Sequence, residues 1–349
     1  MGRRLLPALL AVLAACGGGG GGAGSGTGFR VALVTPGSIA DAAWNAGAYA
    51  GLGQVRDSLG AAVSHVEART PAEQEEALRT YAAEGYALVF GHGFEFQGAA
   101  ERVAADHPGT VFIITSGERV RGSVAPLVFR LHEASYLAGL AAGRLTRTGV
   151  VGFVGGIELP PIKDAYEAWA AGAAATRPGV DSRFTYLNNF DDAAAGREAA
   201  HALIRQGADV LHHNADAAAL GVFQAVRETP GTWIFGANAD QRGLVPGRVV
   251  ASAVIDLPRA ILAVAREVRE GRFTPKVESF GLASGVIRFD ADPAAREALP
   301  DSAWALIERA RDSIMASDGQ AGGGGVDSSA AAGASGGAGA SGAAGSPGA

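Results

Sequence analysis

Short apolar runs along this chain alternate with segments whose apolar residues recur every three or four positions. The apolar runs of a first series are Arg30–Thr35, Ala62–Val66, Ala87–Gly91 and Thr110–Thr115. The helical segments between them are Asn45–Leu59, Pro71–Glu84 and Phe96–Asp106. Continuous apolar strands that alternate with helices are typical of a parallel sheet covered on both faces.

A second series repeats this order. Its predicted strands are Val150–Gly155, Ser182–Tyr186, Ala208–His212 and Thr232–Gly236. Its predicted helices are Lys163–Ala175, Ala193–Gln206 and Ala217–Glu228. We expect helix His132–Leu145 to enter this series, and strand Val249–Ile255 with helix Pro258–Glu270 to return towards the first. Two such series predict an α/β fold of two doubly wound parallel-sheet lobes joined by a hinge.

Composition sets the ends of this folded region. Residues 17–28 and 318–349 consist almost entirely of Gly, Ala and Ser. Such segments bury too little apolar surface to offset the entropy of ordering, so we predict a flexible tether over 16–28 and a disordered tail over 318–349. Between them, the predicted division into lobes is 29–130 with 256–282 for lobe 1, and 131–255 with 283–317 for lobe 2.

The N-terminus carries a secretion signal. Arg3 and Arg4 precede an apolar stretch over residues 5–15 that is too short to span a membrane. Residues 13–16 are Leu-Ala-Ala-Cys, and Cys16 is the only cysteine. This motif resembles the lipobox of bacterial lipoproteins, which implies a signal peptide over 1–15 and lipidation of Cys16. We therefore expect a lipid-anchored protein on the cell membrane, facing the periplasm or exterior; an incidental cysteine is the alternative.

Charge narrows the range of partners. The sequence has 29 Lys and Arg against 35 Asp and Glu, for a formal net charge of −6. Loss of residues 1–15 removes two arginines and no acid, so the mature chain is more negative still. Such a surface repels phosphates, and nucleic acid is therefore not an expected partner.

Open α/β sheets bind ligands beyond the carboxyl ends of their strands, so the residues just after the strands of both series are the candidates for the site. Two facing lobes place these ends around one cleft. Trp44 offers a flat stacking surface and Asn45 can donate and accept hydrogen bonds, although a core position for Trp44 is the alternative. Asp41 either contacts the ligand or caps the next helix. His92 and Glu95 either bond a ligand or one another.

The second series offers three more loops. Gly156 belongs to a tight glycine and proline turn that does not match GxGxxG, so a nucleotide-phosphate cradle is not indicated. Asn214 and Asp216 follow one predicted strand, and Asn238 and Asp240 follow the next. Short amides and carboxylates suit a polyhydroxylated ligand. A helix cap is the competing interpretation of Asp216.

Patterns for catalysis are missing from the sequence. It holds neither a GxSxG elbow nor an HExxH metal helix. His212 and His213 are adjacent and would point to opposite faces of a strand, so we do not expect them to share a metal. We predict a binding protein without cofactor or metal rather than an enzyme. A nucleoside hydrolase with Asp216 or Asp240 as general base is the less favoured alternative.

From about Phe29 to Phe289 the chain resembles the basic membrane protein family of bacterial substrate-binding lipoproteins. The motifs that carry the resemblance occur in order at Asp41–Asn45, Gly91–Glu95, Glu133–Gly139, Val151–Gly156 and Phe190–Asp192. The resemblance implies a fold like that of type I periplasmic binding proteins. It also implies that the protein captures a small molecule, a purine nucleoside or base, and delivers it to an ABC permease and its ATPase. We expect the protein to be a monomer.

The resemblance further implies roles for single residues. Trp44 matches the aromatic residue that stacks on the base, and Asn45 is its partner. Asn238 stands where nucleoside receptors of the family carry an aspartate that holds the ribose. Pro36 and Ile255 replace a base-reading aspartate and a lysine, which removes two charge-assisted contacts. A free base or another metabolite therefore stays open as the ligand, and so does a sensor that signals to a membrane partner.

Overall fold

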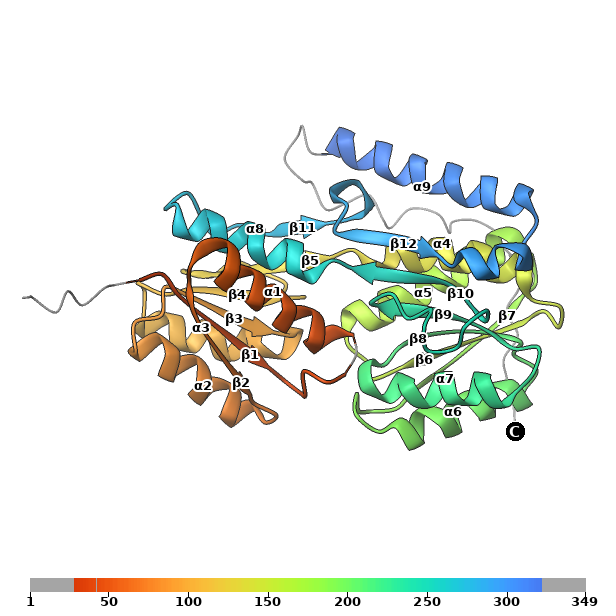
Figure 1. The fold of residues 1–349 in the computed structure, drawn as a ribbon, viewed down its shortest axis with the longest axis horizontal. Helices are drawn as coiled ribbons and strands as arrows, with labels where there is room; N and C mark the ends of the chain where they lie inside the picture. The colour runs from red at the N-terminus through yellow and green to blue at the C-terminus, as the bar shows by residue number, and fades with distance from the viewer. Residues whose placement is uncertain (1–27, 42, 322–349) are drawn as a thin grey trace, which may run out of the picture.

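The structure is a computed structural model that describes residues 28–41 and 43–321. Two α/β lobes lie side by side along the long axis of the molecule (Figure 1). Residues 1–27, which include the predicted signal peptide, Cys16 and nearly all of the tether, and residues 322–349 lie outside the described residues, so the lipid anchor stays a prediction. Among the described helices, none combines the length and apolar character that crossing a bilayer requires.

The first sheet has six strands within the described residues, in the order β11-β5-β4-β3-β1-β2, and every pair is parallel. Its strands are β1 (Arg30–Thr35), β2 (Ala62–Glu67), β3 (Leu88–His92), β4 (Val111–Thr115), β5 (Val124–Phe129) and β11 (Glu278–Phe280). Strand order reverses between β1 and β3, so the loops after these two strands diverge and leave a crevice at the carboxyl edge.

Helices cover both faces of this sheet. Successive side chains of β1 point to opposite faces, and both sets are apolar and buried. Val31 and Leu33 pack with α1 (Trp44–Leu59) and α8 (Leu257–Arg269), whereas Ala32 and Val34 pack with helices on the opposite face. Those opposite helices are α2 (Pro71–Ala83), η1 (Phe94–Phe96) and α3 (Gln97–Asp106). Buried residues on both faces explain why the strands are apolar without interruption.

The second sheet repeats the arrangement in the order β12-β10-β9-β8-β6-β7, with its reversal between β6 and β8. Its strands are β6 (Val150–Gly155), β7 (Asp181–Tyr186), β8 (Val210–Asn214), β9 (Trp233–Asn238), β10 (Val249–Ile255) and β12 (Ile287–Ala291). Its helical elements are α4 (Leu131–Leu145), α5 (Pro160–Thr176), α6 (Ala193–Arg205), η2 (Asp216–Ala218), α7 (Ala219–Glu228), η3 (Leu282–Ser284), η4 (Pro293–Ala298) and α9 (Asp301–Ala321). Only β12 runs antiparallel to its neighbour in the described part of this sheet.

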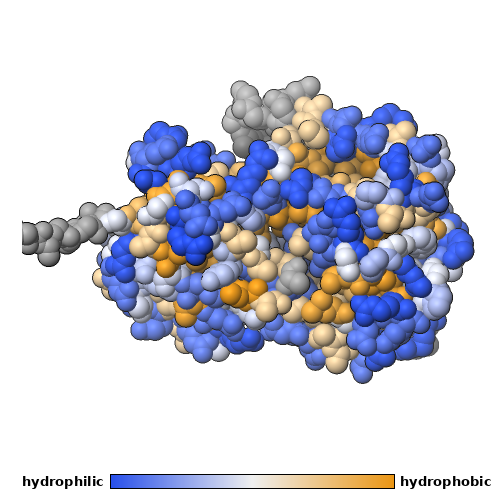
Figure 2. All heavy atoms as spheres, viewed as in Figure 1, coloured by the Kyte–Doolittle hydropathy of each residue, from blue (hydrophilic) through white to orange (hydrophobic). Residues whose placement is uncertain are grey.

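The chain crosses between the lobes at three neighbouring places within the described residues: from β5 into α4, from β10 into α8, and from β11 to β12. These crossings place Phe129, Leu131 and Ile255 at the junction of the two lobes. On the face shown in Figure 2, hydrophilic side chains cover most of the outer surface, and apolar side chains show along the boundary between the lobes.

Several elements were not foreseen by the hydrophobic pattern. Strand β5 contains Pro126, which is unusual inside a sheet. The pairing with β11 covers only Leu127–Phe129, so Pro126 lies beyond the part of β5 that has a neighbour on both sides. Beyond Glu270 no element was predicted, yet β11, β12 and α9 follow. Helix α9 also includes residues 318–321, which the composition had assigned to the tail.

Candidate ligand-binding site

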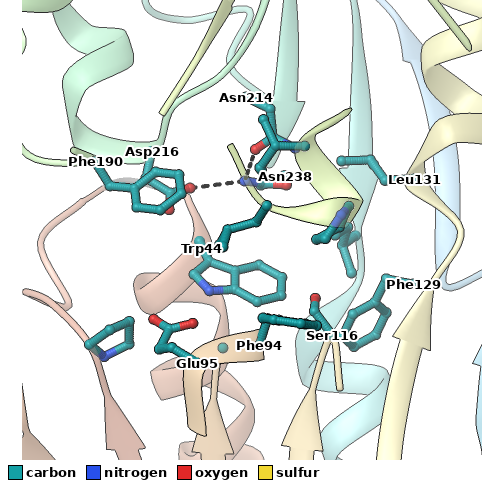
Figure 3. A pocket seen from close by; sticks show the side chains of 16 residues that line it. Trp44, Phe94, Glu95, Ser116, Phe129, Leu131, Phe190, Asn214, Asp216 and Asn238 are labelled. Carbon is teal, nitrogen blue, oxygen red and sulfur yellow. Dashed lines mark hydrogen bonds between the residues drawn. The ribbon is translucent and has the colours of Figure 1, made fainter. Parts of the chain in front are cut away.

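A largely apolar cavity lies between the lobes, at the carboxyl ends of both sheets (Figure 3). The space left by the surrounding atoms is about 590 Å³, including the part open to solvent. Its lining residues are Pro36, Trp44, Gly93, Phe94, Glu95, Ser116, Phe129, Leu131, Leu159, Pro161, Ile162, Phe190, Asn214, Asp216, Asn238 and Ile255.

Backbone strain in this structure is concentrated at the cavity. Among the described residues, four that are not glycine have a positive φ: Ser116 at 57°, Asn188 at 59°, Asp216 at 46° and Asn238 at 66°. Ser116, Asp216 and Asn238 line the cavity, and Asn188 lines a polar pocket that adjoins it. Such conformations persist where the surrounding structure imposes them, and they cluster at binding sites. The strained backbone conformations and the cavity therefore indicate the same ligand-binding site.

Trp44 begins helix α1, and Asp41 fixes that start. The Asp41 carboxylate accepts hydrogen bonds from the backbone N–H groups of Ala43 (3.1 Å), Asn45 (2.6 Å) and Ala46 (2.9 Å). These bonds satisfy donors that have no partner within the first turn of the helix. The structure thus supports the capping interpretation of Asp41, which lines the adjoining polar pocket and not the aromatic cavity.

One face of the Trp44 indole rests on His92, with ring centroids 4.2 Å apart and planes 22° apart. Histidine Nε2 donates to the Trp44 carbonyl (3.1 Å), and Nδ1 accepts from the Thr115 hydroxyl (2.9 Å). Burial lowers the pKa of His92 to about 3, so the ring is neutral. His92 does not line the cavity, and its ring nitrogens bond Trp44 and Thr115 and not Glu95, so it supports the indole from the side away from the cavity.

Three polar side chains converge from the second lobe (Figure 3). The amide Nδ2 of Asn238 donates to Asn214 Oδ1 (3.2 Å) and to Asp216 Oδ1 (2.9 Å). Asn214 ends β8, Asn238 ends β9, and Asp216 begins η2. Neighbouring parallel strands bring these groups together because their carboxyl ends share one edge of the sheet.

The carboxyl groups of the cavity are held in a negative environment. Burial, together with the nearby acids Asp41, Glu95 and Asp191, raises the pKa of Asp216 to about 8, although the hydrogen bond from Asn238 acts in the opposite direction. Loss of surrounding water also raises the pKa of Glu95, although solvent still reaches that residue through the cleft. Among the residues that line the cavity, none carries a positive charge.

The adjoining polar pocket contains Asn45 and an ion pair between the lobes. Asn45 is buried, and its Oδ1 has no hydrogen-bond partner among the described residues. Arg69 of the first lobe lies 3.3 Å from Asp191 Oδ2 of the second and also pairs with Glu67 at 2.5 Å. The two pockets share Glu95, Asp216 and Phe190 in their walls.

Two expected contact residues lie outside the cavity. Asp240 is exposed and forms an ion pair with Arg242, which lowers its pKa. Gly156 is buried behind Phe190, and a Cβ at this position would overlap the Phe190 ring. The glycine therefore acts through Phe190, because its small size lets that aromatic ring reach the cavity wall.

Sequence reasoning missed most of the aromatic wall, formed with Trp44 by Phe94, Phe129 and Phe190. Phe94 and Phe190 stand in motifs that carried the family resemblance, whereas Phe129 ends the strand that was not predicted. Pro36 and Ile255, the positions at which the family resemblance implies charged residues in nucleoside receptors, both line the cavity. This part of the wall is apolar.

The paired histidines of β8 point to opposite sides, as predicted from their adjacency. His212 bonds the Phe235 carbonyl (3.1 Å) on one side, and His213 Nε2 bonds Gln241 Oε1 (2.9 Å) on the other. Burial lowers their pKa values to about 3 and about 4. Within the described ranges there is no group of three or more His, Cys, Asp or Glu suited to a metal ion.

Comparison with known proteins gives a consistent result. The family described as "ABC transporter substrate-binding protein PnrA-like" matches residues 29–313. The "ABC transporter nucleoside-binding protein BmpA" of Lactococcus lactis is 26% identical over 316 residues, covering 83% of this chain and 90% of that protein. "Basic membrane protein A1" of Borrelia garinii is 26% identical over 279 residues, covering 76% and 80%.

Solved structures share the fold. A solute-binding protein of an ABC transporter system from Aeropyrum pernix superposes with a TM-score of 0.77 at 22% identity, over 83% of this chain and 92% of that one. At this identity the likeness concerns the fold alone. It confirms the predicted pair of α/β lobes.

Proposed function

We propose that this chain, which belongs to the family of PnrA-like ABC transporter substrate-binding proteins, captures a purine nucleoside or base between its lobes and delivers it to an ABC importer. A lipid anchor at Cys16, a location outside the cytoplasmic membrane, and a monomeric state belong to the same proposal. The nucleoside assignment is supported by the name of the Lactococcus lactis relative, which is given as nucleoside-binding.

The observation that carries the proposal is the position of Trp44. His92 covers one face of its indole, and the residue lines the cavity between the lobes. An aromatic surface held from behind can stack on a flat heterocycle without paying much conformational entropy. Phe129 meets the indole edge-on at 6.0 Å and restricts it further. A purine has the shape that this arrangement favours.

The polar end of the cavity suits hydroxyl groups. Because Asn238 Nδ2 already donates to Asn214 and Asp216, its Oδ1 remains as an acceptor. The second oxygen of the Asp216 carboxyl holds the proton at neutral pH, so it can both donate and accept. A ribose hydroxyl can donate to such atoms. This role for Asn238 agrees with the position at which nucleoside receptors of the family hold the sugar.

The hydrolase alternative gains no support from the geometry. A general base must be unprotonated at the working pH. Burial keeps the Asp216 carboxyl largely protonated at neutral pH, since its pKa is about 8. Asp240 lies outside the cavity in its ion pair with Arg242. Release of free base from a nucleoside by the purified protein would nevertheless overturn the proposal of a binding protein.

Calorimetry with adenosine, guanosine, inosine and their bases tests the proposal. We expect Trp44→Ala to weaken binding more than tenfold, because it removes stacking worth about 1 kcal/mol together with buried apolar area. The melting temperature without ligand should stay close to that of the wild type, since Trp44 is partly exposed.

Two variants serve as controls for this measurement. Trp44→Phe keeps a flat ring and should retain most of the affinity. Trp233→Phe changes a tryptophan at the start of β9 that does not line the cavity, and its affinity should equal that of the wild type. Equal affinity in the wild type and Trp44→Ala would remove Trp44 from the site, and absence of binding by every purine would overturn the proposed function.

A further inference from the structure

Two carboxylates face the cavity from opposite lobes without a cation between them. Glu95 comes from η1 of the first lobe, and Asp216 begins η2 of the second (Figure 3). Within the described residues, no Lys, Arg or His forms an ion pair with either group. Once both carboxyl groups are ionised, the ligand site therefore carries excess negative charge.

Carboxylates elsewhere in the molecule are placed differently. Glu101 is nearly buried, yet it pairs with Arg119 at 2.9 Å. Glu228 pairs with Arg197 at 2.9 Å, and Asp240 pairs with Arg242. The fold supplies arginine partners in many places, so the lack of one beside Glu95 and Asp216 distinguishes the cavity.

Hydrogen-bonding groups at the polar end are mainly acceptors. Asn238 uses both hydrogens of Nδ2 on Asn214 and Asp216, which leaves its Oδ1 as an acceptor. In the adjoining pocket, the Oδ1 of buried Asn45 has no partner among the described residues. Donors on the ligand satisfy these atoms, and a ligand that only accepts leaves them without partners.

The aromatic wall favours the same kind of ligand. Trp44, Phe94, Phe129 and Phe190 line the cavity. A cation near an aromatic face is attracted by the negative potential of the ring, most strongly for an indole and away from bulk water. Because His92 behind the indole is neutral, it does not oppose this attraction.

We propose, resting on the function assigned above, that the cavity selects flat ligands by charge, binding those whose polar end is a cationic nitrogen group in preference to neutral ones and excluding anions. Asp216 and Glu95 are the residues that set this preference. Arg69 in the adjoining pocket does not counter it, because Glu67 and Asp191 already pair with its guanidinium.

The electrostatics of Asp216 agree with this selection. Burial and the neighbouring acids Asp41, Glu95 and Asp191 together raise its pKa to about 8. A cation bound beside the carboxyl favours its ionised form and lowers the pKa again. Binding of a cation should therefore release a proton near neutral pH.

Three planar probes of nearly equal shape test the proposal: benzamidinium, benzamide and benzoate. Calorimetry on the full chain at about pH 8.5, above the pKa of Asp216, measures the three affinities. We expect benzamidinium to bind at least tenfold more tightly than benzamide, as a charge-assisted bond does relative to a neutral one, and benzoate not to bind.

Matched variants assign the preference to the two carboxylates. Asp216→Asn keeps the side-chain shape and should reduce the ratio of benzamidinium to benzamide affinity about tenfold. Glu95→Gln should reduce it as well, and provides a second test if Asp216→Asn does not fold. Asp57→Asn changes an exposed carboxylate of α1 that pairs with Arg56 and should leave the ratio unchanged.

The outcomes separate this inference from the proposed function when purine nucleosides are measured in the same assay. Benzamide binding as tightly as benzamidinium, benzoate binding at all, or no binding of benzamidinium overturns the charge selection, while nucleoside binding still supports the proposed function. An unchanged ratio in both carboxylate variants also overturns it. If neither the nucleosides nor any planar probe binds, both proposals fail.

Discussion

Asp216 brings backbone strain, burial and charge together in one residue. Its φ of 46° is uncommon for a residue other than glycine, although aspartate tolerates it better than most. The same turn places the half-buried carboxyl next to Asn238, where the charges of Asp41, Glu95 and Asp191 also act on it. This conformation and environment lower the stability of the folded protein but place a polar group where a ligand can bond it, as is typical of binding sites.

The pKa of Asp216 predicts how stability depends on pH. The folded state holds the proton up to about pH 8, whereas the unfolded state releases it near pH 3.8. The folded state thus binds more protons between these values, so this contribution is present at low pH and is lost as pH rises towards 8. Asp216→Asn removes this contribution to the pH dependence of the free energy of unfolding.

Urea unfolding at pH 5 and pH 8 measures this effect. Between these pH values we expect the wild type to lose at least about 1 kcal/mol relative to Asp216→Asn, since one pKa unit corresponds to about 1.4 kcal/mol. The comparison between variants cancels the contributions of His92, His212 and His213, which both proteins share. Equal losses in the two proteins would show that the carboxyl does not hold its proton in the folded state.

The position of residues after strands accounts for the part of the site that could be predicted. Trp44, Asn214, Asp216 and Asn238 all follow or end strands, and all line one cavity. Asp240 comes only two residues after Asn238, the last residue of β9, yet its side chain accepts a hydrogen bond from Arg242 and is exposed to solvent. Sequence position alone cannot distinguish the two, because the direction of a side chain after a strand depends on local φ and ψ.

At the scale of elements, helix pairs approach closely where both carry glycine. Gly196 of α6 faces the Ala218 carbonyl of η2, and Gly221 of α7 faces the Ala193 carbonyl of α6. A Cβ at either position would overlap those backbone atoms. The close packing against α6 therefore holds both α7 and η2, which precedes α7 directly in the chain. Because η2 begins with Asp216, this helix packing positions a residue of the site.

Gly221→Ala therefore should destabilise the protein by about 1–3 kcal/mol, as overpacking typically does, despite the higher helix propensity of alanine. Gly53→Ala is the matched control, because Gly53 lies in α1 with nothing within 4 Å of a new Cβ. That variant should gain up to about 1 kcal/mol. Urea unfolding measures both changes, and Gly221→Ala at least as stable as Gly53→Ala would contradict the packing argument.

Helices and strands with a clear periodic pattern of apolar residues could be predicted from the sequence. Elements that are stabilised mainly by pairing with distant parts of the chain could not. Strand β1 and helix α1 match the expected ranges to within one residue. Strand β5 was hidden by Pro126, and β11 has only three residues. Such short strands are stabilised by pairing with neighbours far away in the sequence, a contribution that no local window contains.

At the scale of the whole molecule, the site exists only because the two lobes meet. Trp44 and Glu95 come from the first lobe and Asn214, Asp216 and Asn238 from the second, with Ile255 at a crossing between the lobes. The Arg69–Asp191 pair joins the lobes at the exposed rim, where such pairs contribute little. A ligand that touches both walls therefore adds contacts between the lobes that this exposed ion pair does not provide.

Hydrogen exchange with and without the purine nucleoside that binds most tightly in calorimetry tests this account most directly. We predict slower exchange in both lobes at once, in the backbone around Trp44 and Glu95 and in the backbone around Asp216 and Asn238, because a ligand held by both walls lowers local opening on each side. Slowing confined to one lobe, or centred away from these four residues, would contradict the account.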